Sequence, residues 1–188
     1  MVSLDMNQLI EEAVAPLRAG FQKRGIPLRI ECSEGFAPVW GDPIQLQQVI
    51  FNLARNGAEA MGSADGSKEL LVTCRRLADD SVLVAVRDSG AGVHPEYVER
   101  IFDPFFTTKD AGMGMGLSIS RSIIEAHGGR IWAELNQGPG LTVQFSVPPF
   151  AAREPRARND SAARGKVLRR KSSGPVNRAR HQSISRTH

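Results

Sequence analysis

Two asparagines lie one helical turn apart in a segment with the apolar periodicity of a helix. Asn52 and Asn56 are four residues apart, so both side chains share one face of a helix predicted over residues 43–61. An asparagine oxygen can ligate Mg²⁺ when phosphate oxygens and water supply the other ligands. Paired asparagines on an exposed helix face can equally be solvated, so the pair alone leaves both interpretations open.

A carboxylate follows directly after an apolar, strand-like segment. Asp88 opens the sequence DSGAG after SVLVAVR, where the chain leaves a predicted sheet. Such a carboxylate can accept a hydrogen bond from an exocyclic amine such as the 6-amino group of adenine. Gly90 and Gly92 would let a planar ring approach the backbone closely. A plain Asp-Ser-Gly turn is the alternative interpretation.

A glycine-rich segment that contains a lysine could bind an anion. Lys109 precedes Gly112, Gly114 and Gly116, and the last two stand at or just before a predicted helix start. Free backbone N–H groups and the helix dipole favour negative charge there. No strand leads directly into the segment as in a Rossmann fingerprint, and the Lys-Ser/Thr ending of a Walker loop is absent. If this segment binds phosphate, it does so in a way that differs from both the Rossmann fingerprint and the Walker loop.

The remaining pattern predicts the elements that position these residues. Helical periodicity is found in three segments, residues 5–25, 43–61 and about 114–127. Asp5 and Asp42 are the expected N-caps, and Pro16 is expected to bend the first helix. Strand-like segments are found at residues 26–33, 69–77, 81–89, 130–136 and 140–148.

The order of these elements predicts the fold class. Residues 90–114 form a long irregular stretch with one short helical piece at about 95–101, which is typical of a functional loop. Helix, strand, helix, hairpin, loop, helix and hairpin follow one another. This order predicts an α+β fold, a two-layer α/β sandwich in which helices cover one face of a mixed sheet.

The charge divides the chain into two parts. The net charge is +4, but residues 151–188 carry eleven Lys/Arg against two acids, a net of +9, which leaves −5 for residues 1–150. We expect one globular domain over residues 1–150. Residues 151–188 contain too few apolar residues to form a core and are predicted to be a disordered basic tail. The tail is either an arm for nucleic acid or an acidic partner, or a solvated appendage.

The sequence also predicts where the protein is located and in which state its cysteines are. No apolar run approaches the roughly 20 residues that cross a bilayer, and the acidic N-terminal segment lacks the features of a secretory signal. We therefore expect a soluble, cytoplasmic protein. Cys32 and Cys74 lie in strand-like segments without metal-ligand spacing, so both are predicted to be reduced core residues.

Taken together, in this order and spacing, the motifs resemble those of sensor histidine kinases. NLARNGAEAM resembles the N box, DSGAG the first G box, IFDPFFTTK the F box and GMGMGLSIS the second G box. IIEAHGGRIW and GPGLTVQFSVP are similar to the closing segments. The resemblance covers about residues 5–149 and favours the nitrogen-regulation and oxygen-sensing type. It implies the Bergerat ATP-binding fold, shared with the gyrase, chaperone and mismatch-repair ATPases.

The resemblance implies roles for matching residues. Asn56 would ligate Mg²⁺, Asn52 would face the phosphates, Asp88 would bind adenine and Lys109 would reach the phosphates from a lid. Asn52, Asn56 and Lys109 are thus the expected catalytic residues. The remaining implied ATP contacts are Gly90, Gly92, Gly112, Gly114, Gly116, Leu117 and Thr142.

Other positions bear on the lid and on departures from the family pattern. Phe105 and Phe106 are expected either to anchor the lid or to belong to ordinary core packing. Gly57 stands where the family usually has alanine and should cost about 1 kcal/mol of helix propensity. Leu141 stands where a small residue is common. Neither departure removes an expected ligand.

What is missing favours a kinase over an ATPase. Related ATPases have a water-activating glutamate where this chain has Asn52, and a carboxamide cannot accept a proton at neutral pH. A complete histidine kinase carries its phosphoacceptor histidine before the first helix, whereas no histidine precedes His94 here. None of the four histidines, His94, His127, His181 and His188, is an expected acceptor.

The predicted function is therefore an ATP- and Mg²⁺-dependent protein-histidine kinase domain of a two-component pathway. Its expected partners are a dimerisation and phosphoacceptor domain, in trans or in a longer parent chain, and a downstream response regulator. Nucleic acid is not an expected partner. Two alternatives stay open: a stand-alone serine kinase resembling the anti-sigma factor kinases, and an ATP-binding regulatory module that transfers no phosphate.

Overall fold

The computed structural model describes residues 1–33, 38–62, 67–108 and 112–149. All of them belong to one compact unit, Met1–Pro155. Lys109 and the predicted tail, residues 151–188, lie outside the described residues.

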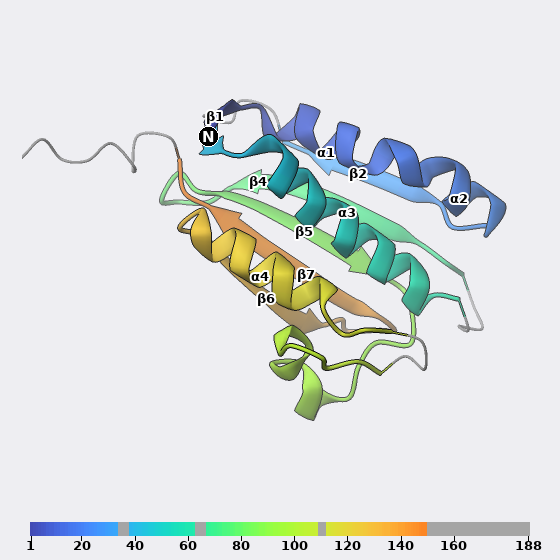
Figure 1. Cartoon of the computed structure of the whole chain (residues 1–188). Coiled ribbons are helices and arrows are strands. Elements are labelled where there is room, and N and C mark those ends of the chain that lie inside the picture. Colours follow the sequence, from blue (N-terminus) through green and yellow to red (C-terminus); the bar gives the residue numbers. More distant parts are fainter. Residues whose placement is uncertain (34–37, 63–66, 109–111, 150–188) are drawn as a thin grey trace, which may run out of the picture. The chain divides into compact units, whose positions relative to one another are not determined.

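A five-stranded mixed sheet forms one layer of this unit (Figure 1). The strands are β2 (Leu28–Cys32), β4 (Leu70–Arg76), β5 (Val82–Asp88), β6 (Arg130–Leu135) and β7 (Leu141–Val147). Their order across the sheet is β2-β4-β5-β7-β6. β2 and β4 are parallel, because a helix connects them, whereas the other neighbours are antiparallel. Both predicted hairpins, β4–β5 and β6–β7, are confirmed.

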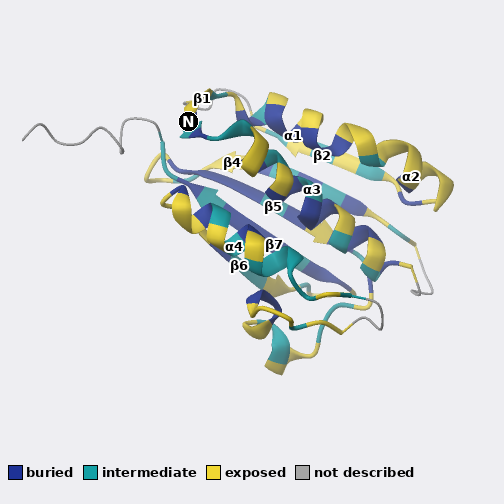
Figure 2. Ribbon diagram, viewed as in Figure 1, coloured by how far each residue is buried: buried dark blue, intermediate teal, exposed yellow. Residues whose placement is uncertain are grey.

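Helices cover one face of this sheet (Figure 1). They are α1 (Met6–Val14), α2 (Arg18–Lys23), α3 (Pro43–Ala60) and α4 (Gly116–Ala126). Buried residues lie on the sides of these helices that face the strands, and exposed residues lie on the opposite sides (Figure 2). The predicted two-layer α+β architecture is confirmed.

Local signals in the sequence explain the ends of these helices. Asp5 accepts hydrogen bonds from the backbone N–H groups of Asn7 and Gln8, and Asp42 accepts one from Gln45, so both predicted N-caps are confirmed. The predicted bend in the first helix is a 3₁₀ turn, Ala15–Leu17, which separates α1 from α2. Pro16 at its centre has no N–H to continue the α-helical ladder.

A small second sheet was not predicted. β1 (Val2–Leu4) pairs antiparallel with β3 (Val39–Gly41). Three residues are too few to show a period, and the partners are far apart in sequence. These strands therefore depend on pairing with each other in the folded chain and not on local sequence preference.

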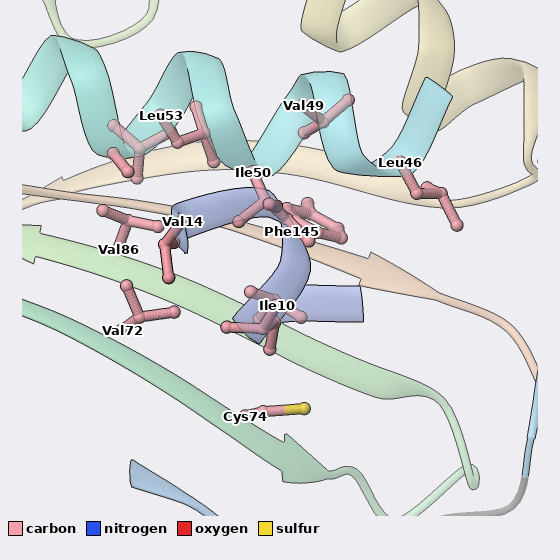
Figure 3. Close-up of a cluster of buried hydrophobic side chains, with 14 of the residues drawn as sticks. Ile10, Val14, Leu46, Val49, Ile50, Leu53, Val72, Cys74, Val86 and Phe145 are labelled. Carbon is pink, nitrogen blue, oxygen red and sulfur yellow. The ribbon is translucent and has the colours of Figure 1, made fainter. Parts of the chain in front are cut away.

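The core lies between α3 and the sheet (Figure 3). α3 contributes a stripe of side chains that are at most 2% exposed: Leu46, Val49, Ile50 and Leu53. Val72, Val86 and Phe145 come from three neighbouring strands to the same cluster. Helical spacing on one layer and two-residue alternation on the other therefore produce one continuous apolar contact.

The two cysteines are free thiols in neighbouring strands. Cys32 and Cys74 are register partners on β2 and β4, and Cys74 is buried while Cys32 is half-buried. Burial raises the pKa of both thiols, so both stay protonated at neutral pH. Both cysteines were predicted to be reduced, and both are free thiols in the structure.

Across the described ranges, every helix is too short or too polar to cross a membrane.

A buried histidine joins the end of α4 to the start of α3. His127 is fully buried, its Nε2 lies 3.0 Å from the backbone N of Asp42, and its Nδ1 lies 2.7 Å from the carbonyl oxygen of Ile123. The N–H of Asp42 can only donate, so Nε2 accepts and Nδ1 carries the proton. A neutral imidazole thus satisfies both backbone groups.

We predict that His127→Ala lowers the free energy of unfolding by about 2–4 kcal/mol, because it leaves a cavity and removes the acceptor of the Asp42 N–H. Urea unfolding monitored by circular dichroism measures this. His94→Ala is the matched control, since His94 is exposed and should change stability by less than about 0.5 kcal/mol. Equal stabilities of the two variants would contradict the assignment.

Candidate functional site

A cavity of about 390 Å³ opens between α3, the end of β5 and the start of α4. Part of its wall is apolar and comes from Leu53, Val86, Ile101, Leu141 and Val143. Polar groups converge on the same space from α3 and β5. A largely apolar cavity with a few placed polar groups is typical of a small-molecule site.

Asp88 lies at the end of β5 and lines this cavity. Its side chain is only 6% exposed, and its Oδ1 accepts a hydrogen bond of 2.8 Å from the backbone N–H of Gly90. A Cβ atom at Gly57 would lie 3.2 Å from Asp88 Cβ and 2.8 Å from Leu70 Cδ1. The glycine in α3 therefore permits the close approach of the helix to Asp88.

Gly90 and Gly92 have different roles in the turn after Asp88. Gly90 does not line the cavity, and a Cβ atom there would lie 2.7 Å from the carbonyl carbon and oxygen of Ala60. It lets the turn pack on the last residue of α3. Gly92 does line the cavity and adopts a left-handed conformation with φ of 69°, which glycine adopts at little cost.

Thr142 supports Asp88 from outside the cavity. Its Oγ1 donates a 2.7 Å hydrogen bond to Asn136 Oδ1. Asn136 Nδ2 in turn donates to the carbonyl oxygens of Asp88 and Pro139 at 2.9 and 3.0 Å. No role for Asn136 was predicted, because its hydrogen bond to Asp88 joins residues 48 apart in the chain.

The structure separates the two asparagines of α3. Asn56 is half-buried and lines the cavity, and its Nδ2 would lie 3.8 Å from a Cβ atom at Gly116. It therefore faces the start of α4. Asn52 shares the same helix face but is 8% exposed and does not line the cavity.

The glycine-rich segment borders the cavity as the sequence predicts. Its described lining residues are Gly112, Met113, Gly114, Met115, Gly116 and Leu117. α4 begins at Gly116, slightly later than predicted, because Gly114 has a φ of 65° and cannot be part of a right-handed helix. The first N–H groups of α4 thus lie beside the cavity. Lys109 lies outside the described residues, and its expected contact stays a prediction.

Only one of the two expected lid phenylalanines packs on the body. Phe106 is half-buried against the core, with its ring 5.5 Å from that of Tyr97 and 5.2 Å from the Arg100 guanidinium. Phe105 is 75% exposed, so its expected role as an anchor is wrong. The backbone at Phe105 has a φ of 66° and its N–H donates to Gly114 O, a turn in which the side chain stays in solvent.

Two buried residues before this turn were overlooked in the sequence. Ile101 and Phe102 are at most 6% exposed and lie in a 3₁₀ turn, Arg100–Phe102. This turn packs against α4. The loop is therefore held to the body by the first part of the IFDPFF sequence together with Phe106.

Charged side chains line one part of the cavity. Among the described lining residues these are Arg55, Glu59 and Asp88. Arg55 Nε lies 3.6 Å from Glu59 Oε1, one helical turn away on α3. Neither residue was predicted to belong to the site, although a spacing of four is the usual signal of a helical ion pair. The part of the chain that the structure describes has no cluster of three His, Cys, Asp or Glu that could itself hold a metal.

The chain is similar in sequence to known proteins. Residues 41–151 match the family described as histidine kinase-, DNA gyrase B-, and HSP90-like ATPase. Sensor protein FixL of Bradyrhizobium diazoefficiens is 48% identical over 143 residues, which are 76% of this chain and 28% of FixL. Sporulation kinase E of Bacillus subtilis is 32% identical over 155 residues, 82% of this chain and 20% of that kinase. The chain spans less than a third of the length of these relatives.

Solved structures show the same likeness. The catalytic domain of histidine kinase ThkA, in a nucleotide-free form, has a TM-score of 0.70 at 35% identity and covers 78% of this chain and 94% of its own. ThkA in complex with response regulator protein TrrA has a TM-score of 0.69 at 32% identity and covers 81% and 43%. Full-length ShkA in complex with AMPPNP has a TM-score of 0.70 at 25% identity and covers 78% and 30%.

We predict that Asn136→Ala weakens the binding of adenine nucleotides about fivefold, although Asn136 does not line the cavity. The carbonyl of Asp88 would lose its donor, and the carboxylate would be held less firmly. Calorimetric titration measures the affinity, and Gln137→Ala, at an exposed neighbouring position, is the control. An unchanged affinity in Asn136→Ala would show that the Asn136–Asp88 link has no part in the site.

Proposed function

The chain belongs to the histidine kinase-, DNA gyrase B- and HSP90-like ATPase family, and we propose that it binds ATP with Mg²⁺ and phosphorylates a histidine. The acceptor histidine lies on a dimerisation and phosphoacceptor domain, in trans or in a longer parent chain. One observation carries the proposal: a single cavity has the buried carboxylate of Asp88 at one side and Asn56 with the start of α4 at another.

The part of the cavity around Asp88 suits adenine. Its carboxylate can accept a hydrogen bond from the 6-amino group, while Val86, Leu141 and Val143 offer apolar surface to the ring. Gly92 brings backbone to the same wall without a side chain. The polar contact gives orientation and the apolar contacts give most of the buried surface.

The part of the cavity around Asn56 suits the phosphates. Gly114, Gly116 and Leu117 place free backbone N–H groups and the positive end of α4 there. Lys109 would add a cation from the lid. Asn52 lies on the same helix face and would act on the phosphate end through its position behind Asn56.

The donor set also fits Mg²⁺. Asn56 offers one amide oxygen at the phosphate end, and an ion that takes most of its ligands from phosphate oxygens and water needs little more from the protein. Bound there, the ion would neutralise part of the charge on the phosphates. Asn56 is therefore the proposed metal ligand.

Transfer to histidine follows from the groups that this site contains. The acceptor imidazole nitrogen forms a bond to the γ-phosphorus while the bond from that phosphorus to the β–γ bridging oxygen breaks, and ADP leaves. The imidazole proton passes to an acid residue beside the acceptor histidine. The chain contributes position and charge rather than a base, since Asn52 has a carboxamide where a water-activating glutamate would be needed.

The phosphohistidine would then serve a response regulator in a two-component pathway. The solved complex of ThkA with response regulator protein TrrA supports this class of partner. We place the chain in the cytoplasm, because that compartment supplies both ATP and response regulators.

We predict that the chain transfers label from γ-labelled ATP to an added phosphoacceptor domain, giving an acid-labile, base-stable product. Asn56→Ala should reduce this transfer at least about 100-fold, because the proposed metal ligand is lost. Gln48→Ala, an exposed position on the same helix, should leave it unchanged. Autoradiography after acid and base treatment measures both.

Two other results would replace the proposal with an alternative. Acid-stable label on a serine of an anti-sigma antagonist would indicate the serine kinase. Tight ATP binding without transfer to either acceptor would indicate a regulatory module.

We predict that Asp88→Asn weakens ATP binding by about 100-fold, because a charged acceptor for the adenine amine is replaced by a neutral carboxamide. Titration calorimetry measures the affinity. Asp103→Asn, at an exposed position, is the matched control. If Asp88→Asn bound ATP as tightly as the unaltered chain, the adenine assignment would be wrong.

A further inference from the structure

Arg55 is the one cation among the described residues that line the cavity. The described wall also contains two carboxylates, Glu59 and Asp88. A triphosphate is strongly anionic, so a cation in the wall would attract it. The position of Arg55 therefore bears directly on how the proposed ligand could bind.

Arg55 belongs to a continuous patch on α3. Asn52 and Asn56 are four residues apart, as are Arg55 and Glu59, while Arg55 follows Asn52 by three and Glu59 follows Asn56 by three. Residues three and four apart are neighbours on a helix surface, so the four side chains share one face. Arg55 and Glu59 lie at the solvent side of this patch, with side chains 48% and 40% exposed, whereas Asn52 is buried.

Two contacts hold the guanidinium in place without using its outer nitrogens. Nε lies 3.6 Å from Glu59 Oε1, and Cζ lies 5.9 Å from the centre of the Phe51 ring. Among the described residues, neither Nη1 nor Nη2 has a hydrogen-bond partner. The outer N–H groups of the planar guanidinium can therefore pair with phosphate oxygens while Nε faces Glu59.

We infer that Arg55 is a nucleotide-binding residue, whose Nη groups contact the β- and γ-phosphates while Glu59 orients it through Nε. This inference rests on the proposed function and assigns a residue to the triphosphate end of the same cavity. Arg55 thereby sets specificity for the length of the phosphate chain. Glu59 is a positioning residue, since it acts through Arg55.

The test compares nucleotides that differ only in their phosphates. ATP, ADP and AMP are titrated with Mg²⁺ into the full chain and into Arg55→Gln, Arg55→Lys and the control Arg75→Gln, whose arginine is exposed on β4 and does not line the cavity. Arg55→Gln should weaken ATP binding at least about tenfold while AMP binding changes less than about twofold. Arg55→Lys should lie between, because it keeps the charge but loses the paired donors.

Other outcomes overturn the inference in distinguishable ways. Equal losses for ATP and AMP in Arg55→Gln would show that the residue only supports the helix. An unchanged ATP affinity would show that Arg55 does not touch the phosphates, while the proposed function would stand. If the unaltered chain bound none of the three nucleotides, the proposed function would fail, and this inference with it.

Discussion

The site depends on how closely α3 lies against the end of β5. At Gly57 the helix has no side chain, and a Cβ atom there would come within 3.2 Å of Asp88 Cβ. Three residues later, Ala60 lies against Gly90, where a Cβ atom would be 2.7 Å from the Ala60 carbonyl group. Because a glycine on each side permits this approach, Asp88 and Asn56 reach the same cavity from two different elements.

This approach explains why a residue unfavourable to helices stands in the middle of α3. Glycine costs about 1 kcal/mol of helix propensity relative to alanine, yet α3 is continuous from Pro43 to Ala60. The apolar stripe against the sheet stabilises the helix by more than that, since each fully buried Leu, Ile or Val contributes about 1.5–3 kcal/mol. Core packing thus offsets a local weakness that the site requires.

The parts of the molecule with a strong local signal could be predicted from the sequence. α3, α4 and both hairpins have clear periods, and the caps Asp5 and Asp42 have short-range chemistry that the sequence shows directly. The β1–β3 pair and the Asn136–Asp88 hydrogen bond join residues far apart in the chain, so no local pattern reports them. Phe105 was assigned wrongly because residue type does not reveal a left-handed turn.

His127 and the cavity lie at opposite ends of the same pair of helices. The Nε2 of His127 accepts a hydrogen bond from Asp42 at the start of α3, and its Nδ1 contacts Ile123 in the last turn of α4, so one side chain joins these two ends. At the other end, Asn56 of α3 faces Gly116 at the start of α4 with no side chain between them. The two helices are thus joined at one end by His127 and border the cavity at the other. Because that space lies between a carboxamide and free backbone N–H groups, charge complementarity favours an anion that brings its own cation.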